Sequence, residues 1–500
     1  LHQLFFLYFD IDVSFKYYNR RIVMKTITKI NFIFLFSFLY NQNVMPGLTI
    51  YTPQVAGGGG GGSTTYLKNE DGVTVKTWSH SRGPASMPYM YPDSSILFPY
   101  RVQNPTMNAG GVGGGVQRIS WEGEILWDYQ VSNNDYQHHH DVEPLPNGNV
   151  LIMAWERKTG AETYAMGRED INNPLNECWS EAVFEYDPIQ DAIVWEWHLW
   201  DHLVQDVNPS LPNYGQISDH PELFNINEGN IGGAGGPGGE PNADWLHFNA
   251  VSYNAELDQI VFSSRHVNEI FVIDHSTTTE EAAGHTGGQY GKGGDFLYRW
   301  GNPQNYDRGG NGNQQLNSQH GVNWINPGFP GEGNFILYNN IYSNNNSAVF
   351  ELIPPYDGNG GYIIEDGEPF GPTSPTWMHS GGFYSEVQSG AFRLQNGNTL
   401  ITDANSSRFF EVSPGGSIVF DYTQNGSSMI ARAQKYNYDY FQTYDLGDAN
   451  GDGNIDVLDV VSTVNIILGF SDFTPAADLN QDGVVNVLDV IGIVNIILGG

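Results

Sequence analysis

Three stretches in the middle of the chain carry histidines at a shared spacing. They cover residues 138–142, 244–251 and 319–322, and each ends in a valine. Counted back from that valine, His138 and His247 lie four residues before it, and His140, Asn249 and His320 lie two before it. Residues two apart in a strand share a face, so these side chains are expected to converge if the stretches are strands. Imidazole titrates near neutral pH and can attack an electrophile, so the stretches are candidates for acid–base or nucleophilic chemistry.

The run 138–140 has a second interpretation, as a metal site, because neutral imidazole is a common ligand. Adjacent strand residues point to opposite faces, so the three rings could reach one ion only across a bulge. Metal binding is therefore the weaker interpretation. A third possibility is that each histidine is a structural residue of its strand.

Two segments near the C-terminal end have the spacing of calcium-binding loops. The first offers Asp448, Asn450, Asp452, the backbone carbonyl of Asn454, Asp456 through water, and Asp459; the second offers Asp478, Asn480, Asp482, Val484, Asn486 and Asp489. Ca²⁺ takes about six to eight oxygens, and a glycine at position 6 allows the sharp turn between ligands. Gly453 and Gly483 occupy that position. The sequence therefore predicts two bound Ca²⁺ ions.

An apolar helix is expected after each loop, at 460–468 and 490–498, and no matching helix precedes either loop. Position 12 is Asp rather than the Glu of an ordinary EF-hand. This duplicated pattern resembles the dockerin family over residues 445–500. The resemblance implies a docking role, with a cohesin-like protein or a cell-surface scaffold as partner. Positions 10 and 11, where the best-known dockerins carry a hydroxyl pair, are apolar (457–458 and 487–488), and they could contact a partner or lie in the core.

The elements that must position the histidines alternate six times between residues 47 and 424. One element is a short strand introduced by a turn, at 48–52, 95–98, 148–152, 259–262, 333–337 and 397–401. The other is a hairpin, at 65–78, 116–127, 182–197, 269–300, 348–377 and 409–420. This pattern predicts an all-β, six-bladed β-propeller, closed between 48–52 and the hairpin at 409–420, followed by a small α-helical, duplicated EF-hand-like domain. A pair of β-sandwiches is the alternative, and it explains the sixfold repeat less well.

Several motifs make residues 47–440 resemble the arylsulfate sulfotransferase family, whose members are six-bladed propellers. These motifs lie at 244–249, 263–265, 319–320, 393–400 and 410–412. The resemblance implies transfer of a sulfuryl group from a phenolic sulfate ester to a phenolic acceptor through a histidine intermediate, with no nucleotide sulfate donor. It implies His247 and His320 as the catalytic pair, with Arg265 and His140 binding the sulfate. Cationic side chains suit the negative charge on sulfuryl oxygens.

The sequence departs from the family pattern in two places. In the family, an arginine follows the blade strand after the stretch that carries His320, but residues 338–346 contain none. Gln388 stands where a nucleophilic histidine is expected. His379 is the reserve candidate for the nucleophile. The departures keep two other hypotheses open: a propeller that binds a sulfated or carbohydrate ligand without turnover, and a structural subunit anchored through its dockerin.

The composition limits the class of protein. The net charge is −35, with 21 Lys and Arg against 56 Asp and Glu, which argues against a nucleic-acid partner. The single cysteine, Cys178, excludes an intramolecular disulfide. Met24, two lysines and the apolar run 30–40 predict a signal peptide at 24–46, after a translated upstream segment at 1–23. We therefore expect a secreted protein, extracellular, cell-surface or periplasmic, and not an integral membrane protein.

Overall fold

The computed structural model describes residues 43–54, 61–232, 239–426, 428–441, 446–471, 474–480 and 484–499. The predicted upstream segment and the predicted signal peptide lie outside these residues, apart from 43–46, and so does Asp482. No helix within the described ranges has the length and apolar character needed to cross a membrane.

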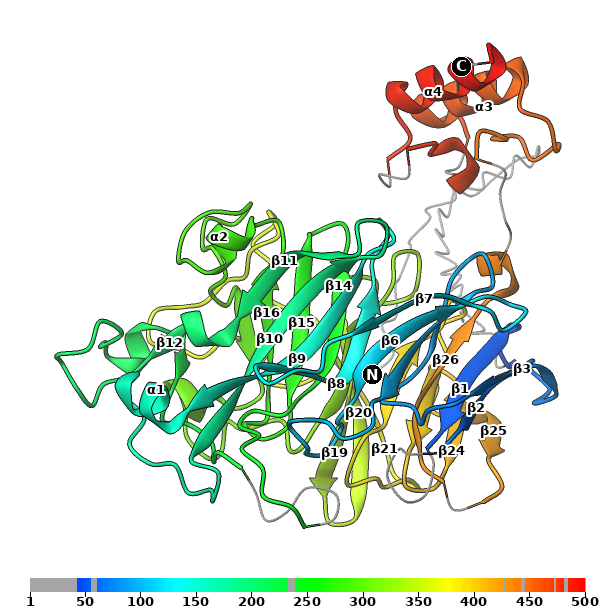
Figure 1. Cartoon of the computed structure of the whole chain (residues 1–500). Helices are drawn as coiled ribbons and strands as arrows, with labels where there is room; N and C mark the ends of the chain where they lie inside the picture. Colours follow the sequence, from blue (N-terminus) through cyan, green and yellow to red (C-terminus); the bar gives the residue numbers. More distant parts are fainter. Residues whose placement is uncertain are drawn as a thin grey trace, which may run out of the picture. The chain divides into compact units, whose positions relative to one another are not determined.

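Six four-stranded antiparallel sheets form the blades of a propeller (Figure 1). Starting from the first strand of each sheet, blade one is β26 (Ile430–Tyr436), β1 (Leu48–Pro53), β2 (Ser63–Lys68) and β3 (Thr74–His80), and blade two is β4 (Tyr89–Met90), β5 (Ile96–Arg101), β6 (Gly114–Ile119) and β7 (Ile125–Gln130). Blade three is β8 (Tyr136–Pro144), β9 (Val150–Thr159), β10 (Glu177–Asp187) and β11 (Ala192–His198), and blade four is β14 (Phe248–Asn254), β15 (Gln259–Ser264), β16 (Glu269–Asp274) and β17 (Tyr298–Trp300). Blade five is β18 (His320–Trp324), β19 (Phe335–Ser343), β20 (Asn346–Leu352) and β21 (Trp377–Ser380), and blade six is β22 (Gly390–Arg393), β23 (Thr399–Asp403), β24 (Arg408–Val412) and β25 (Ile418–Thr423). The first strands β8, β14, β18, β22 and β26 contact one another in turn, so they line the central channel.

The predicted sixfold repeat is confirmed. Each predicted short strand is the second strand of a blade, namely β1, β5, β9, β15, β19 and β23. Each predicted hairpin supplies the third and fourth strands of the same blade. The three histidine stretches contribute to the first strands β8, β14 and β18. Both faces of the middle strands are buried between neighbouring blades, which explains their nearly continuous apolar and aromatic character.

The ring closes in a different way from the prediction. β1 pairs with β26, for example Thr49 with Lys435, whereas the hairpin expected to close the ring forms β24 and β25 of blade six. The chain supplies a further strand, residues 430–436, in which polar side chains alternate with small ones, so it carries little of the apolar signal that marks the other strands. Pairing between the two ends of the propeller removes the exposed edges that an open sheet would present.

Large aromatic side chains fill the space between blades three and four. Trp155, Trp179, Trp197 and Trp245 belong to one core cluster and are almost completely buried. Such rings each bury about 150–250 Å². Cys178 lies in the same cluster, and burial raises its pKa, so the thiol is a core residue rather than a nucleophile.

Short elements complete the propeller. They are α1 (Gly160–Ala165), α2 (Thr279–Ala282), the parallel pair β12 (Leu203–Val204) and β13 (Phe224–Asn225), and four 3₁₀ turns at Leu199–Asp201, Ile217–Asp219, Pro303–Tyr306 and Tyr438–Phe441. α1 and α2 each begin with a threonine and a glutamate that form a capping box, which satisfies backbone N–H groups of the first turn.

The C-terminal module contains α3 (Val457–Ile467) and α4 (Val487–Ile497), joined through a 3₁₀ turn at Pro475–Ala477. Both helices begin three residues earlier than predicted, because Asp456 and Asn486 act as N-caps. The apolar residues of positions 10 and 11 are therefore helical. Val457 and Leu458 are 65% and 54% exposed, and Val487 and Leu488 are 62% and 60% exposed, so these pairs do not lie in the core of the module.

Candidate active site

Three histidines from three consecutive blades meet at one end of the central channel. His140 lies in β8, His247 directly precedes β14, and His320 begins β18. The rings of His140 and His247 are 4.5 Å apart between centroids, edge to face. His320 interacts electrostatically with His140, His247 and Arg265. The structure thus brings together four of the predicted site residues: His140, His247, His320 and Arg265.

The backbone at these positions is irregular. His140 and His247 adopt left-handed conformations, with φ of 52° and 55°, and Gln388 has the same conformation, with φ of 55°. The pairing register shifts beside each histidine, in β8, β14 and β18. A non-glycine residue in this region costs about 1–3 kcal/mol and is typical of functional sites. Gln388, two residues before β22 of blade six, therefore shares the left-handed backbone conformation of these two histidines.

Because of the bulge in β8, the histidine of blade three that lies beside His247 differs from the one predicted. Counting along regular strands matches His138 with His247, but His140 is the residue that contacts His247. His138 is buried, and its Nδ1 accepts a hydrogen bond from the backbone N–H of Gly114 at 2.9 Å. Its neighbour His139 interacts with Glu181, so the rings of 138–140 do not converge on one metal ion.

His247 is oriented by an acidic partner. Its Nδ1 lies 2.5 Å from Oδ2 of Asp244, whose other oxygen accepts from the indole N–H of Trp155 at 3.1 Å. Burial alone would raise the pKa of Asp244, but the charge and hydrogen bond of His247 lower it to about 2. The ionised carboxylate holds the proton on Nδ1, and Nε2 is left to exchange a proton with a ligand.

His320 is held as a neutral ring. Its Nδ1 donates to Oδ1 of Asn340 at 2.9 Å and to the carbonyl of Ser318 at 3.0 Å. The amide of Asn340 cannot turn, because its N–H₂ donates to the carbonyls of Ser385 and Gln388. Burial, assisted by the charge of Arg265, lowers the pKa of His320 to about 3. The ring therefore carries a free electron pair on Nε2 at neutral pH.

His140 stands at the end of a hydrogen-bonded chain. Glu181 accepts from Nε2 of His139 at 3.0 Å, and Nδ1 of His139 is 2.9 Å from Nδ1 of His140. If His139 donates to the carboxylate, its Nδ1 accepts the proton of His140 Nδ1, and His140 then presents an electron pair on Nε2. Burial and the neighbouring histidines lower the pKa of His140.

Two arginines lie beside these rings without a hydrogen-bond partner for their side chains among the described residues. Arg265 follows β15, and Arg101 ends β5; the Nε atom of each is buried and unpaired. Arg265 acts electrostatically on His320, and Arg101 acts on His140. Burial lowers the pKa of both guanidinium groups. Burying an unpaired charge is costly, so this arrangement fits an anionic ligand. Sequence reasoning missed Arg101, which belongs to none of the motifs.

A glycine-rich loop between β5 and β6 packs against the histidines. A Cβ atom on Gly111 would lie 2.0 Å from the Cε1 and Nε2 atoms of His140, and one on Gly110 would lie 3.2 Å from Cε1 of His247. The backbone N–H of His140 donates to the carbonyl of Gly111 at 2.7 Å. Only glycine allows the loop to approach the rings this closely.

The structure places His379 apart from this cluster. It lies in β21, the fourth strand of blade five, whereas His320 lies in the first. Three strand spacings correspond to about 14 Å. The ring stacks near Trp377 and Phe383, with centroid distances of 6.2 and 5.9 Å. His379 is therefore a blade-packing residue in this structure.

The opposite end of the channel holds a separate cavity of about 370 Å³. Its lining includes Glu143 and Trp324, near the ends of β8 and β18, and Arg432 of β26 at its inner limit. A buried ion pair between Arg432 and Asp141, joined by Tyr89, lies between this cavity and the histidines along the strands. Burial raises the pKa of Glu143 to about 8, with the charge of Asp141 adding to the effect.

The predicted calcium loops have their carboxylates turned inward. In the first loop, Asp448 accepts from the backbone N–H groups of Asp452 and Gly453 at 3.0 and 2.8 Å. Asp459 accepts from Asn450 and Asp456 at 3.0 and 2.8 Å. In the second loop, Asp489 accepts from Asn480 and Asn486 at 3.2 and 2.8 Å.

The residues of the two loops fit a hard cation. Asp459 and Asp489 are completely buried, and Asp448 and Asp478 nearly so. Residues 446–500 contain eight aspartates and no Lys, Arg or His, so no side chain of this segment can neutralise them.

Comparison with known proteins agrees with these observations. A family model described as Arylsulfotransferase (ASST) matches residues 101–440, and a model of the dockerin type I domain matches residues 446–498. No curated protein matches the chain. Among solved structures, a protein of unknown function from Bacteroides caccae is 11% identical with a TM-score of 0.41, over 78% of this chain and 98% of that chain. Virginiamycin B lyase from Staphylococcus aureus is 12% identical with a TM-score of 0.33, over 78% of this chain and 87% of that chain.

The structural similarities are too low to bear on function, but the family model covers more than half of the chain. The chain belongs to the arylsulfotransferase family and carries a dockerin type I domain over residues 446–498.

Proposed function

We propose that the propeller transfers a sulfuryl group from a phenolic sulfate ester to a phenolic acceptor through a histidine intermediate, without a nucleotide sulfate donor. The observation that supports this most strongly is the meeting of three imidazoles with two unpaired arginines at one end of the channel, within the part of the chain that the structure describes. Such a group suits a sulfate ester, because imidazole supplies a nucleophile and an acid while guanidinium groups bind the sulfuryl oxygens.

In the first half of the proposed reaction, the electron pair on Nε2 of His320 attacks the sulfur atom of the aryl sulfate. The bond between sulfur and the aryl oxygen breaks. In this proposal His247 begins the reaction protonated on both ring nitrogens, and the departing oxygen takes the proton from its Nε2. This leaves a phenol and a sulfuryl group bonded to His320. Burial keeps His320 neutral, and the Asp244 carboxylate keeps the other nitrogen of His247 protonated.

In the second half, a phenolic acceptor enters and its oxygen attacks the same sulfur atom. The sulfur–nitrogen bond breaks, and the phenolic proton returns to Nε2 of His247. Arg101 and Arg265 bind the sulfuryl oxygens in both halves, whereas the neutral ring of His140, which presents an electron pair on Nε2, donates no hydrogen bond to them. Atoms and charges balance, and the enzyme ends in its starting state.

In this proposal, other residues of the site take the roles of the arginine and the nucleophilic histidine that the family pattern expects. Arg101 from blade two and Arg265 from blade four supply the positive charge that residues 338–346 lack. Asn340, in that stretch, instead fixes the ring of His320. His320 takes the nucleophilic role that Gln388 cannot perform.

A chromogenic aryl sulfate with and without added phenol tests this function. Release of the chromogenic phenol should accelerate when the acceptor is present, because the acceptor discharges the intermediate. His247→Ala and His320→Ala should each lower kcat by roughly 10²–10⁴-fold. His379→Ala is the matched control and should be unaffected. Activity that survives the double His247→Ala, His320→Ala variant contradicts the proposal.

The presence of Gln388 favours a second candidate function, a propeller that binds a sulfated ligand without turnover. The Oε1 atom of Gln388 is buried and lacks a hydrogen-bond partner among the described residues, so it could accept from a ligand. Binding of an aryl sulfate by calorimetry, with no phenol released, would favour this alternative.

For the C-terminal module, we propose that the two loops bind one Ca²⁺ each and that the module docks to a cohesin-type partner outside the cell or on its surface. The buried aspartates of loops without basic residues support the calcium assignment. The exposed pairs at 457–458 and 487–488 support an apolar contact with the partner. Binding of a cohesin domain that is lost with EDTA and weakened by Leu458→Ser with Leu488→Ser tests docking. Export can be tested by sequencing the N-terminus of the mature protein.

A further inference from the structure

Two histidines and an aspartate meet on the outer side of blades three and four. His202 follows β11, the outermost strand of blade three, and the loop between β16 and β17 carries His285 and Asp295. Nδ1 of His202 lies 2.7 Å from Oδ1 of Asp295, and Nδ1 of His285 lies 2.8 Å from the same oxygen. One ligand atom from each residue lies within 4.8 Å of the others.

The hydrogen bonds of His202 leave one requirement unmet. Its Nε2 lies 2.8 Å from the carbonyl oxygen of Ala282, which can only accept, so Nε2 carries a hydrogen. A neutral ring has one N–H, so Nδ1 presents an electron pair to the oxygen of Asp295, which is also an acceptor. Either a second proton on the ring or a bound cation must therefore lie between Nδ1 of His202 and Oδ1 of Asp295. His285 brings a further nitrogen to the same oxygen.

We propose that His202, His285 and Asp295 bind a divalent transition metal ion of the zinc type through the two Nδ1 atoms and the carboxylate. A water molecule completes a tetrahedron, as in sites with three protein ligands. Two imidazoles and one carboxylate suit such an ion better than Ca²⁺, which prefers oxygen ligands. With bonds of about 2.0–2.1 Å, each Nδ1 atom needs to move only about 0.6 Å farther from Oδ1 of Asp295.

The surroundings of His202 are those of an oriented metal ligand. Donation of the second ring nitrogen to a carbonyl is the contact that metal-bound histidines usually make. The ring lies parallel to Trp197, with centroids 5.6 Å apart, and the indole N–H of Trp197 donates to the carbonyl of Gly294 at 2.8 Å. A Cβ on Gly294 would lie 2.0 Å from the carbonyl oxygen of Ala282 and 2.6 Å from Nε2 of His202, so only glycine fits.

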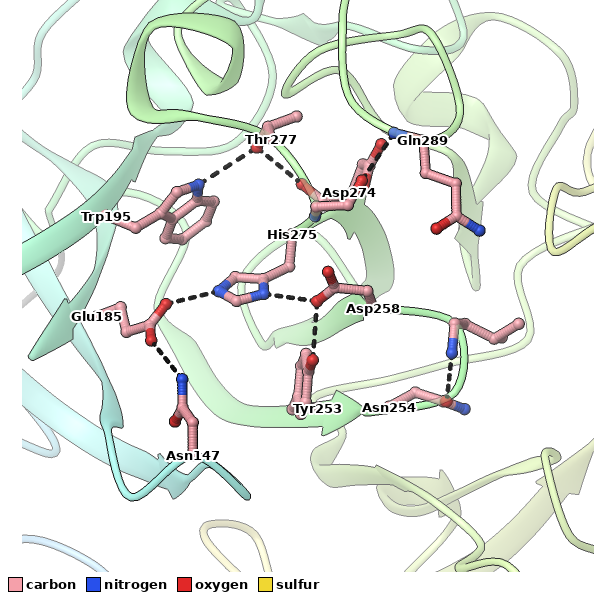
Figure 2. A network of polar contacts seen from close by, with 12 residues as sticks. Asn147, Glu185, Trp195, Tyr253, Asn254, Asp258, Asp274, His275, Thr277 and Gln289 are labelled. Atoms are coloured by element: carbon pink, nitrogen blue, oxygen red, sulfur yellow. Dashed lines mark hydrogen bonds and ion pairs between the residues drawn. The ribbon is translucent and has the colours of Figure 1, made fainter. Parts of the chain in front are cut away.

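The ion would join two blades. The loop that carries His285 and Asp295 is already attached at its first residue, where His275 bridges Glu185 of blade three and Asp258 of blade four (Figure 2). A metal bound to His202 would attach the far end of the loop to blade three as well. The side chain of His285 is 59% exposed, so its replacement should not disturb the core.

Titration of the full chain with Co²⁺ in saturating Ca²⁺ tests the site, because Ca²⁺ occupies the dockerin loops and tetrahedral Co²⁺ absorbs visible light. We expect one equivalent of Co²⁺ to give this absorption and Zn²⁺ to displace it. His285→Gln and Asp295→Asn should each lower the affinity at least about tenfold. Zn²⁺ should raise Tm by about 2–4 °C in the wild type and not in His285→Gln.

His220→Gln is the matched control, since His220 is a partly exposed histidine outside the trio, paired with Glu222. It should bind Co²⁺ like the wild type. Absence of Co²⁺ binding by the wild type would overturn the proposal in favour of a doubly protonated His202. Equal binding by His285→Gln, or loss of binding in His220→Gln, would show adventitious surface binding and would also overturn it.

Discussion

Nδ1 of His247 lies 2.5 Å from Oδ2 of Asp244, three residues earlier in the chain, and this contact fixes which nitrogen of the histidine faces the channel. His247 itself has a left-handed backbone conformation, with φ of 55°. The pair belongs to blade four, and its neighbours His140 and His320 belong to blades three and five. With Arg101 from blade two, the proposed chemistry therefore depends on the correct assembly of four blades.

We predict that Asp244→Asn lowers kcat for aryl sulfate by roughly 10²–10⁴-fold, because an amide can donate to Nδ1 and stabilise the wrong tautomer of His247. KM should change much less, since Asp244 does not contact the sulfate in the proposed mechanism. Initial rates with a chromogenic aryl sulfate provide the measurement. Asp421→Asn, at an ion pair with Arg408 on the outer strand β25, is the control and should retain full activity. Equal rates for Asp244→Asn and the wild type would exclude His247 as the acid.

We predict that Arg101→Gln and Arg265→Gln each weaken inhibition by inorganic sulfate by about tenfold or more, since each removes a charge-assisted contact to an oxygen. The inhibition constant for sulfate measures this directly and does not depend on the identity of the acceptor. Arg118→Gln, at a partly exposed ion pair with Asp93, is the control. If sulfate inhibits all three variants equally, neither arginine binds the anion.

The bridge formed by His275 predicts a loss of stability at alkaline pH. Burial alone would lower the pKa of His275, but hydrogen bonds and charges from Asp258 and Glu185 raise it from 6.5 to about 9. The folded state thus binds the proton more tightly than the unfolded state. The stabilisation is fully present below pH 6.5 and is lost as pH rises through 9; it amounts to roughly 3 kcal/mol.

Urea unfolding of the propeller between about pH 6 and pH 10, in the wild type and in His275→Gln, checks this prediction. The wild type should lose stability toward the alkaline end, and the variant should be less stable at the acidic end but flatter with pH. Parallel pH profiles for the two proteins would show that the histidine is not charged in the folded state.

We predict that Asp459→Asn and Asp489→Asn each abolish one of two calcium sites. Each carboxylate closes its loop at position 12 and accepts two backbone N–H groups there. Calorimetry of the full chain should show two bound Ca²⁺ in the wild type and one in each variant. Turnover of aryl sulfate should not change in either variant. A stoichiometry of two in both variants would refute the assignment of ligands.

The sequence predicts the repeat well because each blade repeats the same two signals, a turn-led apolar strand and a hairpin. It fails at the closing strand, residues 430–436, where alternating polar and small residues give little apolar signal. Residue type and family motifs predict which histidines belong to the site. Spacing does not predict that His140, rather than His138, contacts His247, because the bulge beside His140 shifts the strand register.

Other site features depend on contacts between distant segments. Arg101 and Arg265 are separated in sequence by more than one blade, and no local pattern marks Arg101 as a partner of the site. The same holds for the trio of His202, His285 and Asp295, which comes from two different blades.

His379 illustrates a different limit of the sequence. It is the reserve candidate because it lies near Gln388 in the chain, whereas the structure places it on the outermost strand of blade five. Proximity along the chain does not indicate which strand of a blade faces the channel.

Mass spectrometry of the protein incubated with an aryl sulfate and no acceptor shows directly whether a histidine carries the sulfuryl group. The proposed mechanism predicts one equivalent of released phenol and a sulfuryl adduct on His320, which disappears when a phenolic acceptor is added. The adduct should be absent from His320→Ala and unchanged in His379→Ala. Turnover with no histidine adduct, or turnover that persists when His247 and His320 are both replaced by alanine, would contradict the mechanism.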